Sequence, residues 1–140
     1  MKPTGRQPSP GSPEDWLAHA TSDLNIARLA RGHREVLPAQ ICFHAQQAAE
    51  KALKAVLIFR GVEFPPVHVI RALAQIAQEG GLDVPPEVAD AGSLTPYAVM
   101  TRYPGYGRDL TPQDVDEAIR LAEQVVSWAT AMIAGQGGSA

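Results

Sequence analysis

The stretch that decides the fold runs from Ile41 to Phe59 and reads ICFHAQQAAEKALKAVLIF. At about 100° per residue it separates into an apolar and a polar face, which is the pattern of an amphipathic helix. Alanine dominates the apolar face, so a neighbouring helix can approach closely along it. Pro38 suits the first turn of this helix, and Gly61 suits the position just past its end. The apolar face holds Ala45, Ala48, Ala49, Ala52, Leu53 and Val56, and the polar face holds His44, Gln46, Gln47, Glu50, Lys51 and Lys54.

Helical patterns also lie on both sides of this stretch. Ser12 and Thr111 each precede a proline and have an aspartate three residues on, which is a start signal for a helix. The first of these helices is predicted to close at residues 31–33, and the second shows the most regular apolar period in the chain. The predicted buried stripes are Trp16, Leu17, Ala20, Leu24 and Ala27 in the first helix, and Val115, Ile119, Ala122, Val125, Val126, Ala129, Met132 and Ile133 in the last.

The segment between residues 61 and 100 is predicted to hold two more helices. One runs from Val67 to Glu79, turns Val69, Leu73 and Ile76 inward, and ends at a pair of glycines. The other is weaker, covers residues 87–91, and is followed by a proline that breaks or restarts the segment. Five helices, each with one apolar stripe and joined by short connections, predict an all-α, up-and-down bundle.

Composition indicates a single domain at residues 13–134, because 140 residues with 45% hydrophobic content can bury one core. Residues 1–12 and 135–140 are polar and are expected to be flexible tails. The net charge of −3 gives no global basic field, so any anion site must be local. The single cysteine, Cys42, excludes an internal disulfide and is expected to pack in the core. Neither an apolar run of about 20 residues nor a signal peptide is present, so we expect a cytoplasmic protein with no membrane contact.

The run from Phe43 to Ala55 resembles the signature helix of the HEPN family of small all-helical domains. The resemblance extends to residues 20–24 and 27 upstream, and to Pro66-Val67-His68, Tyr97 and Thr101-Arg102-Tyr103-Pro104 downstream. It covers roughly residues 14 to 133. It implies a helical bundle that usually forms a homodimer and is often encoded beside a minimal nucleotidyltransferase.

Residues 102–108 form the first candidate ligand site, because two cations alternate with two aromatic rings on a glycine-rich loop. Arg102 and Arg108 can bind a phosphate, and the rings of Tyr103 and Tyr106 can stack on a base. In the alternative interpretation Arg102 bonds helix-end carbonyls and the tyrosines cover the end of the bundle.

The polar face of the central helix is the second candidate site, through Gln47, Glu50, Lys51 and Lys54. Composition alone favours a solvated face, on which a Glu50–Lys54 pair contributes about 0.3–0.5 kcal/mol. The resemblance instead implies that this face lines a cleft or the seam of a dimer. His44 is one turn before Gln47 and could join its network.

His68 completes the set of candidate binding residues. It follows two prolines at a predicted helix start, which favours a structural capping role. The family tends to place a small polar residue and an acid around this histidine, whereas Val67 and Val69 stand here, which weakens the transfer of a polar network.

Catalytic and cofactor signals are weak. No His/Cys/acid set has metal-ligand spacing, no phosphate loop or dinucleotide fingerprint occurs, and no cofactor is predicted. HEPN ribonucleases resemble one another in an arginine followed, after four to six residues, by a histidine. After Arg102 those positions hold Gly107, Arg108 and Asp109. The literal match from Arg28 to His33 ends the first helix, in the wrong part of the fold.

The leading hypothesis is therefore a non-catalytic HEPN module. It would bind a nucleotide or a nucleotide-carrying substrate, or partner a minimal nucleotidyltransferase in a toxin–antitoxin-like pair of genes, and RNA is not expected as a partner. A metal-independent ribonuclease toxin is the first alternative, and the missing histidine counts against it. A dimeric interaction scaffold without a ligand is the second.

Overall fold

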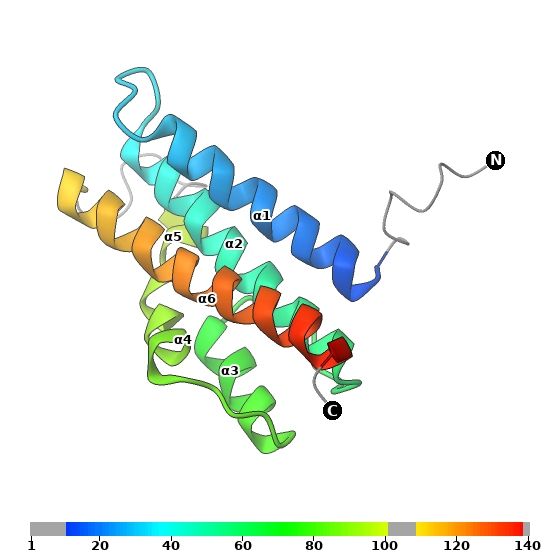
Figure 1. Cartoon of the computed structure of the whole chain (residues 1–140). Helices are drawn as coiled ribbons and strands as arrows, with labels where there is room; N and C mark the ends of the chain where they lie inside the picture. Colours follow the sequence, from blue (N-terminus) through cyan, green and yellow to red (C-terminus); the bar gives the residue numbers. More distant parts are fainter. Residues whose placement is uncertain (1–10, 101–108, 139–140) are drawn as a thin grey trace.

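The computed structural model describes residues 11–100 and 109–138, with side chains through residue 135. Long helices run side by side along the molecule, and the central one packs against both of the others (Figure 1). These are α1 (Pro13–Ala30), α2 (Pro38–Phe59) and α6 (Pro112–Gly138). The short elements cover the remaining sides of α2 and α6, and they are α3 (Ile70–Glu79), α4 (Pro86–Asp90), the 3₁₀ helix η1 (Ala91–Leu94) and α5 (Tyr97–Met100). The described residues contain no strand, and the predicted all-α bundle is confirmed.

The core is built around α2, as its alanine content predicted. Ala45, Ala48, Ala49 and Ala52 are completely buried. Because these side chains end at Cβ, α1 and α6 can both lie close to the α2 backbone. Cys42 is buried in the same core, as expected.

Both predicted helix starts are built as expected. The hydroxyl of Ser12 accepts a hydrogen bond from the Asp15 N–H at 3.0 Å, and the Asp15 carboxylate accepts one from the Gly11 N–H at 3.0 Å. At α6 the pairing is reciprocal, because Thr111 Oγ1 accepts from the Asp114 N–H at 3.1 Å and Asp114 Oδ2 accepts from the Thr111 N–H at 2.8 Å. Local sequence was sufficient to predict these caps, since every partner lies within four residues.

The C-terminal end of α2 is closed by Gly61, whose φ of 70° is in the left-handed region. The N–H of Gly61 donates to the carbonyl of Ile58 at 3.1 Å, and the N–H of Val62 donates to the carbonyl of Leu57 at 2.9 Å. This is the Schellman arrangement, which satisfies carbonyls that the helix itself leaves unpaired. The predicted end of the central helix is therefore correct to one residue.

Two predicted boundaries were wrong. α3 begins at Ile70 instead of Val67, so Val69 lies outside the helix with 46% of its surface exposed while Ile70 is buried. α6 continues to Gly138, past the predicted end at residue 134. The predicted tail of residues 1–12 lies outside the described residues except for its last two, which take part in the α1 cap.

None of the described helices is both long enough and apolar enough to cross a membrane.

Candidate functional site on the central helix

A line of polar side chains on α2 is buried inside the bundle. Gln46, Glu50 and Lys54 follow one another at intervals of four residues, so they stack along one side of the helix. Their exposed fractions are only 0%, 4% and 6%. The composition-based interpretation of a solvated face was therefore wrong for these three residues.

Glu50 is the centre of this line. Its Oε1 accepts a hydrogen bond from the Gln46 amide at 2.8 Å, and its Oε2 accepts one from Lys54 Nζ at 2.9 Å. The Nδ1 of His68 lies 2.9 Å from the same Oε2. Gln47 extends the line outward, because its amide donates to Gln46 Oε1 at 2.8 Å. We call these five residues, Gln46, Gln47, Glu50, Lys54 and His68, the Glu50 network.

The Glu50 network keeps its central carboxyl group ionised. Burial by itself raises the pKa of Glu50, because the charged form loses hydration. The hydrogen bonds from His68, Lys54 and Gln46 act in the opposite direction, and together they outweigh burial. The pKa of Glu50 therefore lies below its ordinary value, and the buried group remains a carboxylate.

The Lys54 ammonium lies near two aromatic rings in addition to its bond with Glu50. Its Nζ lies 5.7 Å from the centre of the Trp16 ring and 6.0 Å from the centre of the Phe64 ring. Both distances are in the range of cation–π attraction. Trp16 comes from α1 and Phe64 from the connector after α2, so Lys54 joins three parts of the chain.

A second cluster repeats the combination of a carboxylate, a lysine and a histidine. Asp23 of α1, only 8% exposed, accepts a hydrogen bond from Lys51 Nζ at 2.7 Å on one oxygen. Its other oxygen lies 2.9 Å from Nδ1 of His44. We call these three residues the Asp23 cluster. His44 thus contacts Asp23, whereas the sequence suggested Gln47 as its neighbour.

His68 does not cap α3, so the structural role expected for it was wrong. The first N–H group of α3, at Ile70, donates to the hydroxyl of Thr95 at 3.2 Å, and no side chain of the preceding residue caps the helix. His68 bonds to Glu50 while 65% of its side chain remains exposed. A buried carboxylate therefore holds an accessible imidazole in a fixed position.

Comparison with known proteins shows which family this bundle belongs to. A model of the HEPN domain family matches residues 13–132. The chain belongs to the HEPN domain family. The crystal structure of an archaeal HEPN homologue matches 87% of this chain and 98% of its own, with 28% sequence identity and a TM-score of 0.68. No curated protein matches the chain.

The other candidate ligand-binding residues predicted from the sequence lie in the loop at residues 102–108 and on α2. Arg102, Tyr103, Tyr106 and Arg108 lie outside the described residues. Lys51 and Lys54 are described, and each bonds to a carboxylate of its own protein.

The literal arginine-to-histidine match, from Arg28 in α1 to His33 after it, does not pair the two side chains with each other. Arg28 bonds to Glu123 of α6 at 2.9 Å, and His33 lies exposed in the connection between α1 and α2. Within the described part of this HEPN chain, no group of three His, Cys, Asp or Glu side chains is placed to hold a metal ion.

Sequence reasoning missed Asp23, Thr95 and the two rings around Lys54. Asp23 carried a usable signal, because an acid between Ala20 and Leu24 interrupts the buried stripe of α1. Thr95 carried none, since it lies 25 residues from the N–H group that it binds.

Proposed function

We propose that this chain is a non-catalytic HEPN module that binds a nucleotide or a nucleotide-carrying substrate at the accessible edge of the Glu50 network. The observation that carries the proposal is the contact between buried Glu50 and exposed His68. A preorganised hydrogen-bonding group at a surface binds a ligand without first losing its own freedom.

The chemistry available at this edge follows from the contact. Because a carboxylate only accepts hydrogen bonds, Nδ1 of His68 is the donor in this contact, which leaves Nε2 as the ring nitrogen that can meet a ligand. Gln47, partly buried, already donates its amide to Gln46, which fixes the orientation of its carbonyl oxygen. An imidazole and an amide oxygen held in this way suit the hydroxyl and amino groups of a nucleoside.

The phosphate part of such a ligand needs cations that are not already neutralised. Lys54 bonds to Glu50 and Lys51 bonds to Asp23, so both lysines serve to position carboxylates. Arg102 and Arg108, outside the described residues, remain the predicted phosphate contacts. Losing one charge-assisted hydrogen bond costs about 1.5–3 kcal/mol, so Arg102→Ala should weaken binding by more than about tenfold.

Calorimetric titration with a panel of nucleotides tests the proposal. His68→Ala should weaken binding by roughly tenfold, since it removes the hydrogen bond from the ligand. His19→Ala is the matched control, because the His19 side chain is also 65% exposed and also faces a carboxylate, at 3.8 Å. The proposal is wrong if the wild type binds no nucleotide, or if the two substitutions have equal effects.

The Glu50–His68 contact also favours a second candidate, the metal-independent ribonuclease. A carboxylate that orients an imidazole is the arrangement of many general bases. It would replace the histidine that is missing after Arg102. We rank this candidate second because the positions where the motif histidine would follow Arg102 hold Gly107, Arg108 and Asp109.

The expected partnership with a minimal nucleotidyltransferase follows from the HEPN resemblance and stays a prediction. Co-purification of this chain with a nucleotidyltransferase encoded beside it would test that part.

A further inference from the structure

A hollow at one end of the bundle lies apart from both polar clusters of α2. It opens between the connection joining α1 to α2 and the beginning of α6, and it encloses about 520 Å³. Small-molecule sites usually enclose about 300–1,000 Å³, so the hollow has the size of a ligand pocket. None of the residues that line it belongs to the Glu50 network or the Asp23 cluster.

The floor of the hollow is apolar. Ile41 and Val115 are almost fully buried beneath it, and Val36 and Leu110 are half-buried at its sides. A flat hydrocarbon body seated on these side chains would remove their remaining apolar surface from water.

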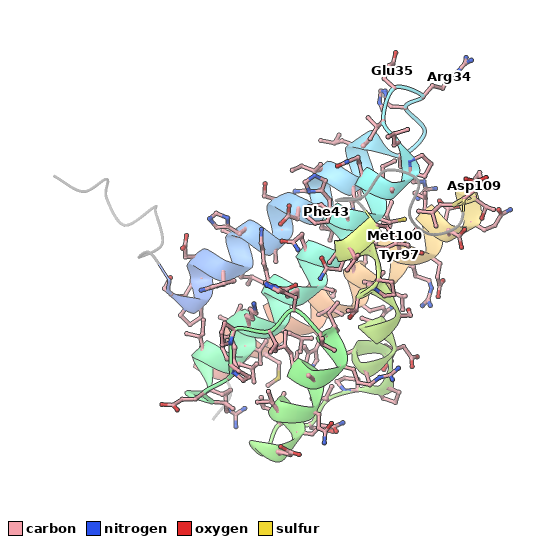
Figure 2. All side chains as sticks on the ribbon, turned by 180° about the vertical axis from the view of Figure 1, so that it is seen from behind. Arg34, Glu35, Phe43, Tyr97, Met100 and Asp109 are labelled. Carbon is pink, nitrogen blue, oxygen red and sulfur yellow. The ribbon has the colours of Figure 1, made fainter. Side chains whose placement is uncertain are left out.

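The rim of the hollow is basic. Arg31, His33 and Arg34 all line it, in a chain whose net charge is −3. Arg31 is paired, with its Nε 3.1 Å from Asp116 Oδ1 across the rim. Among the described residues, no carboxylate pairs with Arg34 or His33. Glu35, the neighbouring acid, does not line the hollow, and Figure 2 shows it projecting with Arg34 from the tip of the connection.

We propose that this hollow binds a small organic anion with a flat apolar body. The body lies on the floor, the anion bonds to Arg34 and His33, and Asp116 weakens binding because it occupies Arg31 and adds a negative charge. Among the described residues, this site shares none with the nucleotide site proposed above.

The first test compares three probes by calorimetry with the full chain, namely 1-naphthyl phosphate, 1-naphthol and inorganic phosphate. Only the first combines a flat apolar body with an anion, so it should bind at least about tenfold more tightly than either of the others. If inorganic phosphate bound as tightly as 1-naphthyl phosphate, the hollow would act only as a patch of positive charge. If 1-naphthol bound as tightly, the hollow would act only as an apolar surface. Either result overturns the proposal.

Two adjacent substitutions test the location. Val36→Trp fills the hollow from its side and should abolish saturable binding of 1-naphthyl phosphate. Leu37→Trp adds the same ring at the next residue, which is 66% exposed and does not line the hollow, so affinity should be unchanged. Circular dichroism confirms that both variants are folded. Equal affinities in the two variants would place the ligand elsewhere.

Charge substitutions test the rim without disturbing the core. Arg34→Ala should weaken binding of 1-naphthyl phosphate roughly fivefold. Arg60→Ala is the control, because it changes the net charge equally but lies at the other end of α2, about 30 Å away, and it should leave the affinity unchanged. Asp116→Asn should strengthen binding, because it frees Arg31 and removes a negative charge. Unchanged or weaker binding in Asp116→Asn would contradict the assigned role of the rim.

Discussion

At the scale of single residues, Glu50 is the group on which the buried polar network of this molecule is centred. It is a charged group that is nearly excluded from water, and it accepts hydrogen bonds from an amide, an ammonium and an imidazole. Taking such groups out of water is costly, and replacing a buried ion pair with apolar side chains often leaves a protein equally stable. No buried side-chain nitrogen or oxygen among the described residues lacks a partner. The stability of this network therefore depends on all its members being present together.

Removal of the Glu50 charge alone should be strongly destabilising. Glu50→Gln keeps the shape of the side chain but leaves the buried Lys54 ammonium without its counter-charge. Breaking a buried pair in this way costs about 3–5 kcal/mol, so urea denaturation should show a loss of that order. Glu117→Gln is the control, because Glu117 also pairs with a cation on its own helix, Arg120, at an exposed position. Equal losses in the two variants would show that burial of Glu50 is not the cause.

The lowered pKa of Glu50 predicts a dependence of stability on pH. A carboxyl group whose pKa is lower when folded than when unfolded contributes stability that is complete above the unfolded value, about 4.5, and is lost as pH falls through the folded value. The difference in unfolding free energy between wild type and Glu50→Gln should therefore be largest near neutral pH and shrink below about pH 4.5. Urea denaturation across that range measures it. A difference that stays constant down to the acid limit of folding would mean that ionised Glu50 contributes nothing.

At the scale of elements, structure that depends on nearby residues could be predicted and structure that depends on distant ones could not. The caps at Ser12 and Thr111 and the stop at Gly61 involve partners within a few residues, and all were predicted correctly. The residues of α2 were assigned correctly to a polar and an apolar face. The burial of part of the polar face could not be predicted, because it depends on α1 and on the segment before α3, which cover that face. The start of α3 depends on Thr95, which no local pattern connects to Ile70.

The Thr95 contact gives a prediction at this scale. Thr95→Val preserves the shape of the side chain but removes the hydroxyl that accepts from the Ile70 N–H. Loss of a helix cap costs about 1 kcal/mol, so the unfolding free energy should fall by about that amount. Thr130→Val is the matched control, because the Thr130 hydroxyl only donates to the Val126 carbonyl within α6, at 2.7 Å. If both variants were equally stable, the start of α3 would owe nothing to Thr95.

At the scale of the whole molecule, the homodimer implied by the HEPN resemblance stays a prediction, and the outer face of α1 is where we expect it. A shallow apolar groove there includes Leu17, Ile26 and Leu29, of which Leu29 is 74% exposed. The first turn of α1 is acidic and its last turn is basic, so an antiparallel second copy would place unlike charges together.

Light scattering at micromolar concentration tests this assembly. The wild type should be a dimer, and Leu29→Glu should shift it toward the monomer, because the substitution places a charge in the apolar contact. Leu37→Glu changes a similarly exposed leucine, 66% accessible, outside the groove and should leave the dimer intact. A monomeric wild type would contradict the prediction.

The account as a whole depends on whether the histidine held by Glu50 binds or catalyses. Incubation of the purified protein with total RNA in the presence of a chelator decides this most directly, with wild type and His68→Ala compared side by side. Cleavage without metal needs a base for the 2′-hydroxyl and a cation for the phosphate charge, and the spacing after Arg102 supplies no histidine. We predict that the RNA stays intact with both proteins. Specific cleavage by the wild type that disappears in His68→Ala would contradict the non-catalytic account and make His68 the general base.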